Sequence, residues 1–121
     1  MNPTTIKIDE IEYIRKDSIT EKPPSVDGME FKIVRGQSTG VFAGYVEKRN
    51  GQEVVMRNAR RIWYWAGAAS LSQLAMEGTS SPESCKFPQT VDRVEILDVI
   101  EIIDVTSKAK SSIDGVKIWR Q

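Results

Sequence analysis

Histidine is absent from this chain of 121 residues. Without it, neither a Ser-His-Asp nor a Cys-His catalytic arrangement can form, and zinc sites built on histidine are excluded. Acid–base catalysis at neutral pH would have to use an Asp, Glu, Lys or Tyr whose pKa is strongly shifted. We therefore expect a protein that is not an enzyme and that carries no metal and no cofactor.

The chain also has a single cysteine, no formal net charge and no long apolar run. Cys85 is the only cysteine, so an intramolecular disulfide is excluded and a reducing compartment is favoured. Its neighbours indicate a polar loop without a basic partner, and we assign the thiol no reactivity. Lys plus Arg and Asp plus Glu both number 17, so the formal net charge is zero. This balance argues against a general nucleic-acid or membrane-surface binder.

The apolar runs are too short to cross a bilayer, and the stretch near Met1 does not resemble a signal peptide. We therefore expect a cytoplasmic protein. Residues 6–16 alternate apolar and polar side chains and predict a β hairpin or two short strands. Pro23-Pro24 indicates a stiff linker. The expected organisation is an N-terminal arm at 1–20, a linker at 21–28 and a single domain at 29–121.

Short alternating runs dominate the domain. Strands are expected over 29–33 and 41–48, and Gly44 within the second strand indicates a bulge or a close backbone approach. Asn50-Gly51 favours a type I′ turn that pairs 45–48 with 53–56. The third strand is expected to run on toward Trp63, with a break near Asn58. The residues between 91 and 105 predict two short strands or one bent strand.

Helix signals are fewer. Ser70 followed by Gln73 matches a capping box, and Gly78 is a typical helix stop. Thr106 could cap a helical turn through Ser112, and 116–119 predicts a final strand. The expected fold class is α+β: a mainly antiparallel β-sheet with one short helix after residue 69 and an N-terminal β arm.

The segment from Arg60 to Ser70 is the strongest candidate for a ligand-binding site, because it combines two arginines with large aromatics. On a regular strand the two arginines point to opposite faces, so we expect one to be structural and the other functional. Stacking of Arg61 on Trp63 is one expectation, and core packing of at least two of the three aromatics is another. The candidate ligand-binding residues are Arg60, Arg61, Trp63, Tyr64, Trp65 and Ser70.

Two further features have competing interpretations. Free N–H groups before the predicted helix, near Gly67 and Ser70, could receive a phosphate or carboxylate, but an ordinary capped helix is favoured because no phosphate-binding glycine pattern is present. An acidic series spaced by three residues could form a hydrolytic site with a divalent metal, but solvated strand edges are favoured. That series is Glu95, Asp98, Glu101 and Asp104.

The run from Ala59 to Gly78, of the form ARRIWYW-x-GA-x-SL-x-x-LA-x-EG, resembles a family of small bacteriophage and prophage proteins of unknown function. Cys85-Lys86-Phe87, Glu101-Ile102-Ile103 and the terminal Val116-x-x-Trp119 also match, and residues 12–18 are similar to openings of small phage proteins. The resemblance covers most of 29–119 and carries no established catalytic residue.

This resemblance implies a non-enzymatic phage accessory protein in the host cytoplasm that acts by binding. Such a protein would inhibit or evade a defence system by capturing a host or defence-system protein, or by sequestering an anionic signalling nucleotide. A small metal- or carboxylate-dependent hydrolase and a phage structural or assembly accessory protein are the alternatives. We also expect a homo-oligomer, formed through the arm or an exposed sheet edge.

Overall fold

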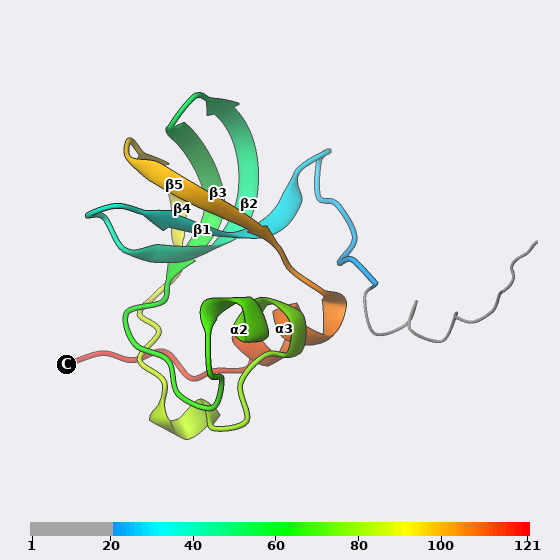
Figure 1. The fold of residues 1–121 in the computed structure, drawn as a ribbon, viewed down its shortest axis with the longest axis vertical. Helices are drawn as coiled ribbons and strands as arrows, with labels where there is room; N and C mark the ends of the chain where they lie inside the picture. Colours follow the sequence, from blue (N-terminus) through cyan, green and yellow to red (C-terminus); the bar gives the residue numbers. More distant parts are fainter. Residues whose placement is uncertain (1–20) are drawn as a thin grey trace, which may run out of the picture.

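The computed structural model describes residues 21–121, so the arm predicted at 1–20 lies outside the described residues. The described part is a mainly antiparallel α+β domain with two layers, a curled sheet and a helical layer beneath it (Figure 1). The elements are β1 (Glu30–Gly36), β2 (Val41–Asn50), β3 (Glu53–Arg61), α2 (Leu71–Glu77), η1 (Pro82–Ser84), β4 (Val91–Ile96), β5 (Val99–Asp104) and α3 (Ser107–Asp114).

The prediction is confirmed for the mainly antiparallel sheet and for the helix after residue 69. The predicted helical turn after Thr106 is a full second helix, α3, so the expectation of one helix is incomplete. The final strand expected at 116–119 does not form. Ile118 makes only an isolated parallel bridge with Phe87. No helix within residues 21–121 is both long and apolar enough to span a membrane.

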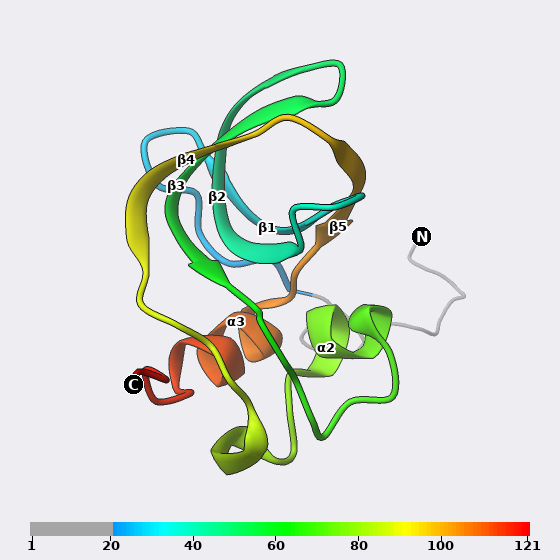
Figure 2. The same cartoon turned by 90° about the vertical axis from the view of Figure 1, so that its left-hand side faces the viewer.

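The five strands follow the order β4-β3-β2-β1-β5, and every neighbouring pair is antiparallel. If the sheet were flat, β4 and β5 would lie about 19 Å apart. Only Leu97 and Asp98 join them, and such a link spans at most about 11 Å. The sheet must therefore curl until its two edges approach one another, as Figure 2 shows. The backbone N–H of Val99 closes this curl by donating to the carbonyl of Gln52 at 3.0 Å.

Curling the sheet buries both of its faces in the central strands. Ile33 and Val34 are neighbours on β1 and must point to opposite faces, yet both are fully buried. Ile33 belongs to a core between the sheet and the helices, together with Leu74 and Phe87. Val34 belongs to a second core inside the curl, together with Met56. The helical layer is therefore packed against the outer face of the curled sheet.

The β2–β3 hairpin is confirmed, but its turn is shifted by one residue. Asn50 pairs with Glu53, so the two central residues are Gly51 and Gln52. Only Gly51 has a positive φ, of 63°, which matches a type II′ turn and not the predicted type I′ turn.

The break predicted near Asn58 in β3 and the close backbone approach predicted at Gly44 in β2 occur at the same place in the sheet. Asn58 has a φ of 49°, and the register between β2 and β3 shifts opposite it. Gly44 lies at this shift, where a Cβ would meet the Cα of Ala59 at 2.7 Å. Gly44 is thus required by the close passage of β3.

The helix caps form as the sequence predicts. Ser70 Oγ accepts from the Gln73 backbone N–H at 3.1 Å, and Gly78 ends α2 with a φ of 81°. Thr106 caps α3 by accepting from the N–H of Ala109 at 3.0 Å. The Thr106 hydroxyl also donates to the carbonyl of Met76 at 2.8 Å, which ties the start of α3 to α2.

The segment predicted as a linker at 21–28 is attached to the domain at two points. The carbonyl of Glu21 accepts from the Ser107 N–H at 2.7 Å, at the start of α3. Val26 and Met29 exchange two backbone hydrogen bonds around a tight turn. The two central residues of this turn, Asp27 and Gly28, have φ angles of 52° and 79°. The two positive φ angles expected at residues 50–51 therefore occur here.

Candidate functional site

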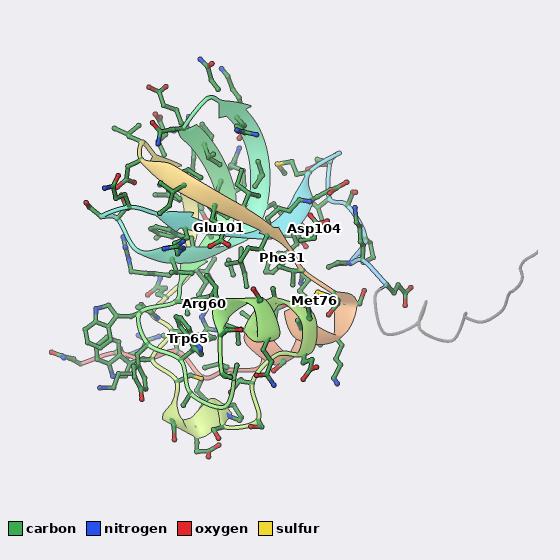
Figure 3. All side chains as sticks on the ribbon, viewed as in Figure 1. Phe31, Arg60, Trp65, Met76, Glu101 and Asp104 are labelled. Carbon is green, nitrogen blue, oxygen red and sulfur yellow. The ribbon has the colours of Figure 1, made fainter. Side chains whose placement is uncertain are left out.

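Arg60 and Arg61 point to opposite faces of β3, as predicted, and they have different roles. Arg60 faces the helical layer and is only 7% exposed (Figure 3). Its guanidinium lies 5.4 Å from the centre of the Phe87 ring. It donates to four carbonyl oxygens, those of Pro88 at 3.0 Å, Ile113 at 3.0 Å, Phe87 at 3.2 Å and Val116 at 2.6 Å. Burial lowers the pKa of Arg60, and the nearby Asp114 carboxylate partly opposes that shift.

These contacts make Arg60 the structural member of the pair. It joins β3 to the segment around Phe87 and to the end of α3. Its hydrogen bonds use the groups that a phosphate or carboxylate ligand would need.

Arg61 lies on the other face, with its guanidinium 4.3 Å from the centre of the Phe42 ring. Its Nη1 donates to the carbonyl of Thr39 at 2.6 Å. Within residues 21–121, no carboxylate lies within 4.0 Å of its guanidinium. The expected stacking of Arg61 on Trp63 is wrong, because its aromatic partner is Phe42.

The regular strand ends at Arg61, which changes the direction of the aromatics. The N–H groups of Trp63 and Tyr64 both donate to the carbonyl of Lys86, at 3.2 and 3.3 Å, so the alternation of a strand is lost. Trp63 is 59% exposed and Tyr64 is 50% exposed. The expectation that at least two of the three aromatics form core is therefore wrong. Only Trp65 packs against the core beneath the sheet.

Trp63 instead stacks on a tryptophan from the end of the chain. The rings of Trp63 and Trp119 have centroids 5.2 Å apart and an interplanar angle of 24°. The ammonium of Lys86 lies 5.5 Å from the centre of each of these rings and 6.0 Å from that of Tyr64. We call Trp63, Tyr64, Lys86 and Trp119 the aromatic platform.

Two grooves each share a residue with the platform. The first, which we call the Arg61 groove, has a volume of about 340 Å³ and includes Trp63 in its wall. It is lined by Thr39, Gly40, Val41, Arg61, Ile62, Trp63 and Trp65. The second has a volume of about 390 Å³, includes Trp119 in its wall, and runs along η1 and the C-terminal segment. Since Trp63 stacks on Trp119, the two grooves and the platform form one surface.

The helix start at Ser70 is an ordinary capped helix. Besides the cap from Ser70, the side chain of Gln73 accepts from the N–H of Ala69 at 2.7 Å. Cys85 lies in the loop after η1, as expected, and its side chain is buried in the core. Its Sγ lies within 3.6 Å of the hydroxyl of Thr79 and of two backbone carbonyls.

The four carboxylates of the acidic series have separate partners. Glu95 pairs with Arg93 at 2.8 Å, Glu101 pairs with Arg35 at 2.8 Å, and Asp104 pairs with Lys32. Asp98 instead accepts from the loop between β1 and β2. No group of three metal-binding side chains is found within residues 21–121. Three of the four carboxylates therefore form ion pairs along strands, and the fourth holds the loop between β1 and β2.

The sequence interpretation did not include Lys86 and Trp119 among the site residues. Lys86 lies in the Cys85-Lys86-Phe87 motif and Trp119 in the Val116-x-x-Trp119 motif noted in the sequence analysis, which is the signal that could have identified them. No local pattern brings Trp119 to Trp63, since the pairing depends on where the C-terminal segment is anchored.

Residues 29–113 match a family model described as a domain of unknown function (DUF6948). The chain belongs to the DUF6948 family. Comparisons with curated proteins and with solved structures found no match. The DUF6948 match contains Arg60, Arg61, Trp63, Tyr64 and Lys86. Trp119 lies beyond its end, so the aromatic platform is completed by a residue outside the matched domain.

Proposed function

We propose that this protein acts by binding a partner protein through the aromatic platform. The observation that carries the proposal is the stack of Trp63 on the half-buried Trp119, in which Trp63 is 59% exposed although aromatic rings of this size favour burial. Tryptophan and tyrosine are the residues that contribute most of the binding energy in many interfaces. Ile118, 46% exposed, extends the apolar surface along the second groove.

The charges around the platform favour an acidic partner surface. Lys86, Lys117 and Arg120 are all exposed, and Glu83 is the acidic residue that lines the second groove. The chain as a whole has no net charge, so this is a local basic region. A cationic rim around an apolar centre steers an acidic partner and excludes a basic one.

The resemblance to phage and prophage proteins supplies the biological context of the proposal. In that context the partner is a protein of the host or of its defence system, and capture of that partner inhibits the defence. The protein is then a stoichiometric binder in the cytoplasm of the host cell.

Sequestration of an anionic nucleotide is the second candidate. It is favoured by an exposed tryptophan next to a lysine, because a base can stack on the ring while the ammonium attracts a phosphate. Arg60 supports neither candidate directly, because its hydrogen bonds are made within the protein.

The test is affinity capture of the tagged protein from bacterial cells that carry defence systems, with partners quantified by mass spectrometry. Trp63→Ala and Trp119→Ala should both lose the partner. Leu97→Ala is the matched control, since Leu97 is 65% exposed but lies on the β4–β5 turn, away from the helical layer (Figure 1). A partner that both tryptophan variants retain would refute the platform. Native mass spectrometry of the purified protein that reveals a retained nucleotide would favour the second candidate.

We also propose that the protein forms a homo-oligomer, through the arm or a sheet edge. The support within the described residues is Ile100 on the edge strand β5, which is 47% exposed. Light scattering on the full chain should find more than one subunit. A stable monomer would refute this assembly.

A further inference from the structure

The Arg61 groove has mainly apolar and aromatic walls, with Thr39 as a polar residue and a single charge. Among the residues that line it, Arg61 is the one charged side chain, and Trp63 and Trp65 supply the largest apolar surfaces. A cation next to aromatic walls requires an anionic partner or water to balance it.

The position of Arg61 is fixed before any ligand binds. Its guanidinium lies over the Phe42 ring, and its Nη1 is held by the carbonyl of Thr39. Thr39 is held in turn by Asp98, whose carboxylate accepts from the hydroxyl and the N–H of Thr39 and from the N–H of Ser38. Such preorganisation lowers the entropy that binding would otherwise cost.

The remaining donors of Arg61 are available to a ligand. Within the described chain, neither Nε nor Nη2 of Arg61 has a hydrogen-bond acceptor, whereas Nη1 has Thr39. The planar guanidinium presents paired N–H groups that match the two oxygens of a carboxylate.

The charge of the groove distinguishes a carboxylate from a phosphate. A phosphate monoester carries about −1.5 to −2 charges at neutral pH and is usually bound by several donors or cations. The groove lining offers one cation, which matches the single charge of a carboxylate. The lining also offers indole surface for an apolar or aromatic group next to that carboxylate.

We infer that the Arg61 groove binds an acidic side chain of the partner, next to an aromatic or apolar residue that packs on Trp63 and Trp65. This inference rests on the proposed function and adds to it the chemical class of the segment that is recognised. The Trp63–Trp119 stack binds the centre of the partner segment, and Arg61 fixes its register by pairing with one carboxylate.

Three small probes test the groove independently of any cellular partner. N-acetyltryptophan carries an indole and a carboxylate, N-acetyltryptophanamide is its neutral match, and AMP carries a base and a phosphate. Each is titrated into the full chain while the NMR signals of the tryptophan indole N–H groups and of the Arg61 Nε–H are followed. N-acetyltryptophan should shift the signals of Trp63, Trp65 and Arg61, and its amide should bind at least about tenfold more weakly.

Arg61→Gln is the test variant, because glutamine is neutral but keeps a donor for the Thr39 carbonyl. It should weaken binding of N-acetyltryptophan at least about tenfold while the backbone spectrum stays folded. Arg57→Ala is the matched control, since Arg57 is an exposed arginine of the same strand that pairs with Glu47. It should leave the titration unchanged.

Three results would overturn the inference. They are equal binding of the acid and its amide, an unchanged affinity in Arg61→Gln, and the absence of shifts with every probe. Tighter, Arg61-dependent binding of AMP would assign the groove to a phosphate instead. A cellular partner that depends on Trp63 but not on Arg61 would leave the proposed function standing and remove this inference alone. If N-acetyltryptophan binds in an Arg61-dependent way but no cellular partner depends on Trp63, the carboxylate site in the groove stands and the proposed function is removed.

Discussion

Arg60 and Trp119 converge on one acceptor, the carbonyl oxygen of Phe87. Nη2 of Arg60 donates to this oxygen at 3.2 Å, and the backbone N–H of Trp119 donates to it at 3.0 Å. Arg60 also holds the carbonyl of Val116 at 2.6 Å. A buried arginine on β3 therefore determines where the C-terminal segment lies, and through it where the Trp119 ring meets Trp63.

Replacing Arg60 should unfold the helical layer more easily and disturb the platform. Arg60→Ala removes the donor to the carbonyls of Pro88 and Val116 and one of the donors to those of Phe87 and Ile113, and we expect it to cost on the order of 3–5 kcal/mol of unfolding free energy. Arg60→Lys keeps the positive charge but not the planar, forked set of guanidinium donors, so it should lower the unfolding free energy by less than Arg60→Ala does. Urea denaturation measures both. Arg57→Ala, an exposed arginine of the same strand, should change the unfolding free energy by about 0.5 kcal/mol or less. A similar small effect for Arg60→Ala would contradict the structural role.

Gly44→Ala should be destabilising because β3 passes too close for a side chain. The added Cβ would lie 2.7 Å from the Cα of Ala59 and 3.0 Å from the carbonyl oxygen of Asn58. Since backbone atoms cannot yield as a side-chain end can, we expect a cost of about 1–3 kcal/mol. Gly115→Ala provides the control, because its nearest contact would be 3.3 Å and its φ is −78°. Equal melting temperatures for the two variants would show that β2 and β3 separate without cost.

Asp98 should make the stability depend on acid pH. The hydroxyl of Thr39 and the N–H of Ser38 hold the pKa of this carboxyl below its ordinary value of 3.8. Because the folded pKa is depressed, the stabilisation is present above the ordinary pKa and is lost as the pH falls through the folded pKa. Asp98→Asn should therefore melt below the parent protein near neutral pH, and this difference in melting temperature should narrow as the pH falls below the ordinary pKa.

Thermal melts of both proteins across this pH range provide the measurement. The depressed pKa values of Glu30 and Asp104, caused mainly by Lys32, occur in both proteins, so the difference isolates Asp98. A gap that is constant with pH would mean that the carboxylate charge contributes nothing. Asp98→Asn should also weaken binding in the Arg61 groove, since the loop that holds Thr39 would loosen.

Local signals in the sequence predicted the parts of the fold that depend on short-range geometry. Ser70 and Gly78 bound the first helix because capping and a positive φ are local requirements. The pairs Asp27-Gly28 and Asn50-Gly51 show that such local signals do not fix the exact position of a turn. Asp27-Gly28 forms the turn with two positive φ angles, while Asn50-Gly51 forms part of a turn shifted by one residue. The register of β2 and β3, set by packing on both sides, decides the position of the second turn.

The candidate site was predicted less well because it depends on long-range contacts. Alternation placed Arg60 and Arg61 on opposite faces, and this held because both lie within β3. Trp63 and Tyr64 follow the end of the strand, where bonds to Lys86 replace the ladder, and both are exposed, so the expectation that at least two of the aromatics form core was wrong. Cys85 is buried because the segments that carry Ala66 and Thr79 lie against its Sγ, which no window of sequence around it reveals.

Removing the platform tryptophans should leave the fold nearly unchanged. Trp63 is 59% exposed, so Trp63→Ala should cost about 1 kcal/mol or less, whereas Phe87→Ala, at a fully buried ring, should cost about 3–5 kcal/mol. The Trp63–Trp119 stack should give a near-ultraviolet circular dichroism signal that disappears in Trp63→Ala and in Trp119→Ala alike. If Trp63→Ala destabilises the protein as strongly as Phe87→Ala, the ring serves the fold, and its exposure no longer argues for a partner.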